Sequence, residues 1–514
     1  MPSESRRTGR KSSPKRSVSI SPPPPPDFSR RISDGGSKTI SSTSQARALS
    51  IRRSSRVKQR LGSETYITCL IEDLRYALKQ LGHVASDAQL EGWAVLVHEW
   101  LSADTRSFHS VHRVFQISEG CDPIQLLACF FRDSISCAAD GKLSPKQQEL
   151  VEGALQPQDP HRLKYDMQDD DKLHMVLDLF GLTPGQSVSR YNGLDVFLSA
   201  LLATRLFGDV LPMAQLAQIA TCMEGTIPFR PRVHGKTPFD RLHDRLTQVN
   251  DQYELGLSES DIVGTIQKAT DLANRNLGNF ASEDATIFLD HTWSLLPERS
   301  TALRRSFLYS VNDMLLATRE MEVFLVDLET RRVFQSFRGV PEEEEMEIFY
   351  KFTKRNIRLG RKYIKAKLLS ICVVAAFAVM TGGDAPMSFF CGDLPANQST
   401  TTVRLGDSFP VKSEDELHQD CNLDVYRIMT TGRHQEQVFD TRNDPLAAFI
   451  YATLGDEGVA KALSKCSFPM RQNRAKDLLM FLPKEAVRLI GEDIGEFALS
   501  RTEAIQELLK DIEP

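Results

Sequence analysis

Residues 105–115 read TRSFHSVHRVF, and residues 126–133 read LLACFFRD. His109 and His112 stand about one helical turn apart, and Asp133 ends an apolar helical run further along the chain. If that run packs against the first helix, the two imidazoles and the carboxylate converge on one point, as a divalent metal requires. The sequence therefore predicts a helical domain built around these segments, with His109, His112 and Asp133 as candidate metal ligands.

Helical periodicity continues on both sides of these segments. Apolar residues recur at helical spacing over residues 63–82, and residues 86–89 have the form of a capping box ahead of the next helix. Residues 322–327 and 332–337 flank a short polar turn, which indicates either a β-hairpin or a helix that ends in a loop. The predicted fold class is mostly α. The further helical patterns cover about 122–137, 192–206, 212–223, 259–279, 284–295, 302–317, 444–454, 456–464, 476–490 and 502–511.

The composition divides the chain into four parts. Residues 1–60 form a Ser-, Arg- and Pro-rich tail, and residues 61–300 are predicted to form one helical domain with an irregular insertion near 155–190. Residues 301–383 are expected to continue the helical region. Residues 384–514 begin with a stretch rich in Gly, Pro, Ser and Thr and then form a C-terminal helical region.

Three further features bear on location. The longest apolar run, residues 368–380, is shorter than the roughly 20 residues that cross a bilayer, so it predicts a buried core helix. The nine cysteines form no C-x-x-C pair and lie mostly in apolar runs, which is typical of reduced thiols. The N-terminus has no apolar segment of the signal-peptide type. We therefore expect no transmembrane segment and a cytoplasmic location, with the nucleus or an organelle as alternatives.

The N-terminal tail differs in charge from the rest of the chain. It holds 15 Lys and Arg against 3 Asp and Glu, whereas the whole chain has a net charge of -5. Its low apolar content predicts disorder. Paired arginines precede Ser33, Ser54 and Ser55, which predicts phosphorylation there by a kinase that prefers basic substrates. Alternatively the tail is a solvating segment with no specific partner, or it binds nucleic acid or anionic membrane through its charge.

The two quoted segments resemble the HD superfamily of metal-dependent phosphohydrolases, in the form where an aromatic-His motif precedes a Phe-His-Asp motif on the next helix. The resemblance covers roughly residues 64–300. It implies a site for a divalent metal (Mn, Fe, Zn or Mg) and hydrolysis of phosphomonoesters or phosphodiesters. His109 corresponds to the first motif, and Asp133 corresponds to the acid of the His-Asp pair. Residues 226–230, 279–281, 292–297 and 381–386 are similar to an uncharacterised group of bacterial and algal proteins with HD-like domains. That similarity implies no activity.

The sequence departs from the HD pattern at several ligand positions. Arg132 stands where the pattern has the His of the His-Asp pair, and a guanidinium is permanently charged and cannot ligate a cation. Arg132 can instead pair with Asp133 or bind a phosphate. Arg113 occupies the place of a further His, which leaves His112 displaced by one residue, or about 100° around a helix. Asn276 stands where a late acid is expected.

One other acid is a candidate for catalysis. Glu224 follows an apolar helix and precedes a proline-broken loop, so it can supply a carboxylate alongside Asp133, or it can pair with Arg230 or Arg232. Arg230 joins Arg132 and Arg113 as a candidate for binding a phosphate or another ligand.

These residues support three hypotheses. The first is a degenerate HD-like protein that is not an enzyme and acts by binding a phosphorylated small molecule or a protein partner. The second is an active metal-dependent phosphohydrolase that uses His109, His112, Asp133 and Glu224 in an altered arrangement. The third is association with nucleic acid or membrane through the basic tail. The sequence contains no phosphate-binding P-loop, no G-x-S-x-G, no H-E-x-x-H and no zinc-spaced cysteine set.

Overall fold

The computed structural model of the chain describes residues 65–166, 170–189, 192–305, 308–392 and 403–512. These residues are mostly α-helical, as predicted, and the one sheet among them has two short antiparallel strands. The tail and its candidate phosphorylation sites, Ser33, Ser54 and Ser55, lie outside the described residues.

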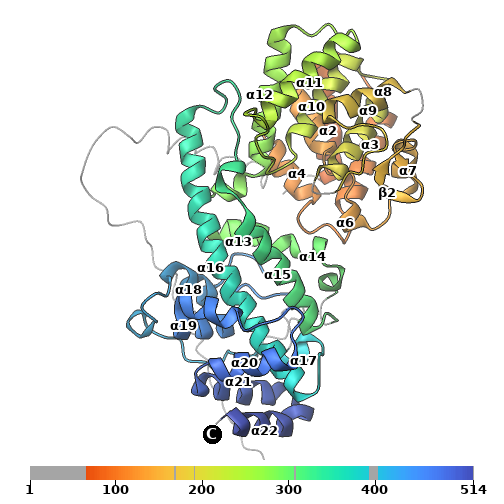
Figure 1. The fold of residues 1–514 in the computed structure, drawn as a ribbon. Helices are drawn as coiled ribbons and strands as arrows, with labels where there is room; N and C mark the ends of the chain where they lie inside the picture. The colour runs from red at the N-terminus through yellow and green to blue at the C-terminus, as the bar shows by residue number, and fades with distance from the viewer. Residues whose placement is uncertain (1–64, 167–169, 190–191, 306–307, 393–402, 513–514) are drawn as a thin grey trace, which may run out of the picture. The chain divides into compact units, whose positions relative to one another are not determined.

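A first hydrophobic cluster gathers buried side chains from Cys69 to Ala273, together with Phe337 from later in the chain. The strands β1 and β2 form a hairpin at the edge of this helical region (Figure 1). The elements that surround this cluster are α2 (Tyr66–Gln80), α3 (Asp87–Leu101), α4 (Val111–Ser118), α5 (Pro123–Phe131), α6 (Cys137–Asp140), α7 (Pro145–Leu150), β1 (Leu155–Gln156), β2 (Asp159–Leu163), α8 (Asp171–Phe180), α9 (Leu194–Phe207), α10 (Met213–Gly225), α11 (Pro238–Gln252) and α12 (Glu259–Asn276).

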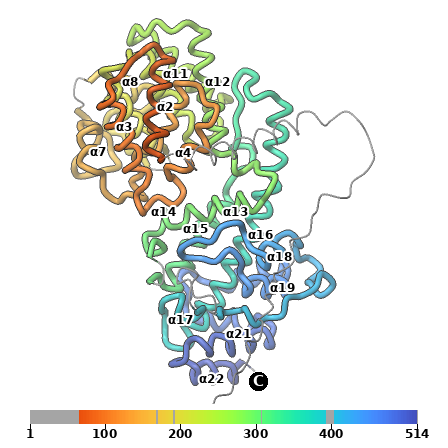
Figure 2. Tube along the Cα trace, turned by 180° about the vertical axis from the view of Figure 1, so that it is seen from behind, coloured from red at the N-terminus to blue at the C-terminus, as the bar shows by residue number. Residues whose placement is uncertain are grey.

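A second hydrophobic cluster runs from Phe280 to Ile512. Figure 2 shows its C-terminal helices, with α17 beside α21 and α21 beside α22. Its elements are η2 (Gly278–Ala281), α13 (Ala285–Ser294), α14 (Leu296–Arg299), η3 (Thr301–Arg304), α15 (Val311–Asp327), η4 (Thr330–Arg332), α16 (Glu343–Thr381), α17 (Met387–Cys391), η6 (Glu414–Glu416), α18 (Leu423–Thr431), α19 (Pro445–Leu463), α20 (Gln472–Phe481), α21 (Lys484–Phe497), η7 (Leu499–Arg501) and α22 (Thr502–Ile512).

Local capping explains where many of these helices begin. The predicted capping box at Ser86 is present: its hydroxyl accepts from the Gln89 N–H, and the Gln89 side chain accepts from the Ser86 N–H. Asp122 caps α5 in the same way, and Pro123 follows at the first helical position, where its missing N–H costs nothing. The sequence thus determines the start of α5, and α5 in turn carries Arg132 at its C-cap.

The long helix α16 holds the predicted core segment. It is the one helix among the described residues that is long and apolar enough to cross a bilayer by length and composition, and 78% of that window is buried inside the protein. It packs against α15, α19 and α20. Residues 368–378 are buried on every side, which confirms the predicted core helix. The helix ends at Gly382, whose positive φ of 144° favours glycine.

Several predicted elements differ from the observed ones. The candidate hairpin is wrong in its first arm, because residues 322–327 are the last turns of α15, and the alternative of a helix ending in a loop is confirmed. The predicted helix at 302–317 begins nine residues later, at Val311, where Ser310 provides the cap. The stretch 155–190 contains a core helix, α8, whose start is capped by Asp170. Its apolar face outweighs the flanking prolines and glycines.

Candidate functional site

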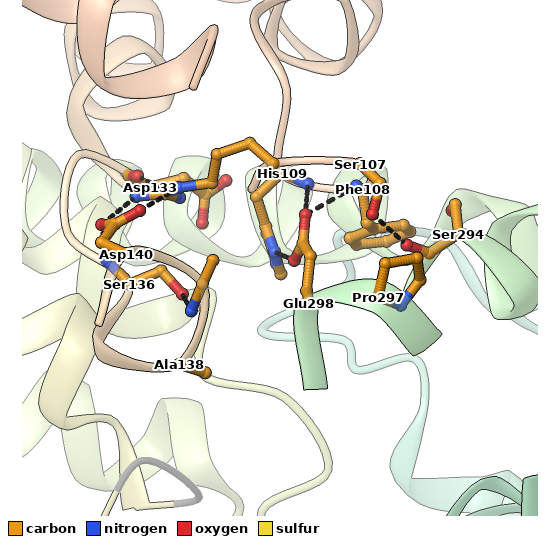
Figure 3. A network of polar contacts seen from close by, with 12 residues as sticks. Ser107, Phe108, His109, Asp133, Ser136, Ala138, Asp140, Ser294, Pro297 and Glu298 are labelled. Atoms are coloured by element: carbon orange, nitrogen blue, oxygen red, sulfur yellow. Dashed lines mark hydrogen bonds and ion pairs between the residues drawn. The ribbon is translucent and has the colours of Figure 1, made fainter. Parts of the chain in front are cut away.

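His109 lies in the turn before α4, because Ser110 caps that helix and leaves the preceding residues outside it. The expectation that His109 and His112 share one helix is therefore wrong. Glu298 of α14 holds this turn through one buried carboxylate, whose side chain is 4% exposed. The carboxylate accepts from the N–H groups of Phe108 (2.6 Å) and His109 (2.8 Å), and it lies 2.6 Å from His109 Nδ1 (Figure 3).

The Glu298 carboxylate is held in its charged form. Burial alone would raise the pKa of Glu298, but attraction to His109 and the hydrogen bonds from His109 and Phe108 bring this pKa below its ordinary value. Since a carboxylate only accepts, Nδ1 of His109 is the nitrogen that carries the proton. In the neutral form of the ring, the other nitrogen, Nε2, carries the lone pair, and the side chain is 24% exposed.

Arg132 and Asp133 form a buried pair directly after α5. Nη1 of Arg132 lies 2.7 Å from Oδ1 and 2.6 Å from Oδ2 of Asp133, and Nε donates to the Thr226 hydroxyl at 2.8 Å. Both side chains are about nine-tenths buried. Burial would raise the pKa of Asp133, but Arg132 and, to a lesser extent, His109, Arg106 and Arg113 lower it. The carboxylate is thus ionised, and both of its oxygens are engaged by a guanidinium.

Arg106 contacts the backbone of Asp133 and pairs with a second aspartate. Its guanidinium donates to both oxygens of Asp140, at 2.8 and 2.7 Å, and to the carbonyl oxygen of Asp133 at 2.9 Å. Its side chain is fully buried. Neither Arg106 nor Asp140 was a candidate from the sequence, because the pair joins residues 34 positions apart with no local motif.

Arg113 is also buried, but it faces other groups. Its guanidinium lies 4.0 Å from the centre of the Phe108 ring, donates to the Asn276 carbonyl at 2.6 Å, and contacts His291 Nδ1 at 3.1 Å. Burial, and then repulsion from Arg132, lower the pKa of Arg113 to about 10. Burial and the Arg113 charge lower the pKa of His291 to about 3, so His291 is neutral. Arg113 therefore serves to pack the turn that carries His109.

The remaining candidates lie in separate groups. His112 has its Nδ1 3.0 Å from the Tyr66 hydroxyl and its Nε2 3.0 Å from the Gln116 amide. Glu224 is buried at the end of α10, where Arg230 and Arg245 both donate to its carboxylate. The alternative that Glu224 pairs with Arg230 is the one observed.

These contacts do not fit the divalent metal that the HD resemblance implies. Both ring nitrogens of His112 and both oxygens of Asp133 and of Glu224 have protein partners, and Nδ1 of His109 faces Glu298. Within the described ranges, no group of three or more His, Cys, Asp or Glu side chains is placed to hold a metal ion. The arrangement can fix a turn and a helix end, and one imidazole nitrogen remains as a potential base or ligand.

Glu298 is a further residue of this site that the sequence did not reveal. It lies 189 positions from His109, and the short helix that contains it and Pro297 carries no signal for a histidine partner. Only the tertiary fold brings the two together.

Comparisons with protein-family models, with curated proteins and with solved structures gave no match to this chain. The class that the fold and the site define is therefore a mostly α-helical protein with a buried arginine–carboxylate pair. The HD resemblance stays a prediction that rests on residues 105–133.

Proposed function

We propose that this chain is a degenerate HD-like protein that acts by binding a partner rather than by metal-dependent hydrolysis. The observation that carries the proposal is the contact of Arg132 with both oxygens of Asp133. Asp133 is the carboxylate that the resemblance assigns to the metal. In this chain a permanent cation occupies its lone pairs.

Charge around Asp133 supports the same conclusion. Arg106 and Arg113 lie close enough to lower the pKa of Asp133 as well. A divalent ion at this carboxylate would have to displace Arg132 and leave its charge buried without a partner, and breaking a buried pair in that way costs about 3–5 kcal/mol. The local field thus favours the guanidinium over the metal.

The kind of ligand follows from how the arginines are used. Arg132 is committed to Asp133, Arg113 to a backbone carbonyl and His291, and Arg230 to Glu224. The guanidinium group of each of these three arginines already has a partner within the protein. These contacts count against a phosphorylated small molecule at these positions, so we place the partner on another surface of the protein.

The location we propose is the cytoplasm. None of the nine cysteines, all of which lie in the described residues, forms a disulfide bond, and five of them are buried. Buried thiols without disulfide bonds agree with a reducing compartment.

An active phosphohydrolase is the second candidate, and one observation favours it. His109 donates Nδ1–H to a buried carboxylate and keeps Nε2 available, which is how metal-binding histidines are commonly oriented. For this reading Arg132 would have to release Asp133 when metal arrives.

Metal analysis separates the two candidates. The full-length protein is dialysed against Mn²⁺, Fe²⁺ or Zn²⁺, its metal content is measured, and it is assayed with a chromogenic phosphomonoester and a phosphodiester. We expect substoichiometric metal and no hydrolysis. Stoichiometric metal that is lost in both His109→Ala and Asp133→Ala, but kept in the surface variant Arg488→Ala, would overturn the proposal.

A further inference from the structure

A pocket in the second hydrophobic cluster is separate from the residues discussed so far. Its cavity volume is about 80 Å³ and it opens to solvent, and it lies between α16, α17 and the loop that leads into α19. Tyr309, Ile371, Val374 and Met387 supply apolar walls. A pocket that is mostly apolar with a few convergent polar groups is the usual form of a small-molecule site.

The polar end of the pocket is built around one buried lysine. Lys367 of α16 is 4% exposed, and its Nζ lies 2.8 Å from Asp440 and 2.8 Å from Asp444. These contacts use two of the three N–H bonds of the ammonium group. Lys367 also lines the pocket, and no third partner of its ammonium group is found among the described residues.

The two carboxylates are already occupied by the protein. The second oxygen of Asp440 accepts from the Trp293 indole N–H at 2.7 Å, and Asp444 caps α19 through the N–H of Ala447 at 2.8 Å. Burial by itself would lower the pKa of Lys367, but Asp440 and Asp444 raise it, so the ammonium stays charged and is not a nucleophile. A cationic ligand would find all four oxygens of Asp440 and Asp444 already engaged.

The charge balance excludes an anion as the preferred ligand. Lys367 and Arg404 face Asp407, Asp440 and Asp444 among the residues that line the pocket. Arg433 also contacts Asp440 at 3.5 Å, so the three cations and the three carboxylates around this end cancel and give an anion no net attraction. The side-chain amide of Asn443 also lines the pocket and has no hydrogen-bond partner within the described part of the chain.

We propose that this pocket binds a small neutral molecule with an apolar body and a carbonyl oxygen that accepts a hydrogen bond from Lys367. The apolar walls hold the body, and the amide of Asn443 lies on the same lining and can bind a second polar group. This site is independent of the proposed function, because it uses no residue of the Arg132 region.

The test uses the full-length protein and the neutral fluorescent naphthyl ketone prodan. Its affinity is measured by fluorescence titration and compared with that of the corresponding dimethylaminonaphthoate, which has the same rings but a carboxylate. We expect saturable binding of the ketone, and we expect the carboxylate to bind at least roughly 10-fold more weakly. Equal binding of the two probes, or no saturable binding of the ketone, would overturn the proposal.

Two variants locate the binding. Lys367→Met combined with Asp444→Asn removes the donor while keeping the net charge and the helix cap, since Asn caps as well as Asp. We expect roughly 10- to 100-fold weaker ketone binding, as expected for a hydrogen bond to a charged group. Lys351→Met, on the exposed side of α16, is the matched control and should bind normally.

Val374→Phe provides an independent variant if the first one does not fold. Val374 is buried and lines the pocket, so the larger ring fills space that the ligand would use. We expect loss of ketone binding in a protein that still folds, with a lower thermal midpoint, because an added ring strains a packed core. Binding that survives both this change and the Lys367 change would show that prodan binds elsewhere and that the ion network is only structural.

Discussion

Replacing Arg132 by methionine tests the buried pair directly. Methionine keeps most of the length and removes the charge, so Asp133 loses both of its side-chain hydrogen bonds. The buried carboxylate then either remains charged or takes up a proton. At the ordinary pKa of 3.8, protonation of a carboxylate at pH 7 costs about 4.4 kcal/mol, which gives the scale of the loss. We expect a loss of about 3–4 kcal/mol.

The double variant isolates the charge effect. Asp133→Asn alone leaves Arg132 buried without a counter-charge and should cost about 3 kcal/mol, whereas Arg132→Met with Asp133→Asn removes both charges and should cost only about 1–2 kcal/mol. The loss in Arg132→Met should also shrink by about 1.4 kcal/mol for each pH unit toward pH 4, because protonation of Asp133 becomes easier.

The assay is urea unfolding followed by far-ultraviolet circular dichroism. Hydrogen–deuterium exchange of peptides within 123–140 and 213–227 assigns the effect to α5 and the end of α10. Lys146→Met, on an exposed surface helix, is the control and should stay within about 0.5 kcal/mol of the unmodified protein. A single Arg132→Met change that costs less than 1 kcal/mol, or a double variant as unstable as the sum of the singles, would refute the reasoning.

Three further predictions concern single groups. Because the pKa of Glu298 is lowered in the fold, its stabilising effect is present above the ordinary value of 4.5 and is lost as the pH falls below it. Hydrogen–deuterium exchange of peptides around His109 should therefore rise at low pH. Glu298→Gln should abolish that pH dependence. His291, with a pKa of about 3, is neutral in the fold, whereas in the unfolded chain it takes up a proton below pH 6.5. The free energy of unfolding should therefore fall by about 1.4 kcal/mol for each pH unit below 6.5. A proton NMR titration that shows His291 charged at pH 5 would contradict this. Burial, and then the charge of Asp444, raise the pKa of Cys391 to about 12, so iodoacetamide at pH 8 should label Cys391 only after unfolding in urea, as mass spectrometry of its peptide would reveal.

Helix starts were accessible from the sequence where they depend on local capping. Ser86 and Gln89 lie three residues apart, and their reciprocal hydrogen bonds need no other part of the chain. The same holds for the pairing of Arg132 with the adjacent Asp133. By contrast, α8 was hidden because its flanking Asp, Pro and Gly residues indicate a loop, and only its burial against other helices makes it a core element.

The candidate site was only partly accessible, for a different reason. A motif states which residue types are near in sequence, but not which of them is already neutralised. Glu298 engages His109 from 189 residues away, and Arg245 engages Glu224 from 21 residues away. These long-range partners decide whether a histidine or a carboxylate is available to a ligand, and they depend on tertiary packing.

Metal content of the Arg132→His variant tests the central claim most directly. Histidine at this position would restore the His-Asp pair of the HD pattern and free both oxygens of Asp133 next to His109. The claim that Arg132 keeps metal out predicts substoichiometric Mn²⁺, Fe²⁺ or Zn²⁺ in the unmodified protein and increased metal in Arg132→His, but not in the surface control Arg488→His. Stoichiometric metal in the unmodified protein that depends on His109 and Asp133 would contradict it.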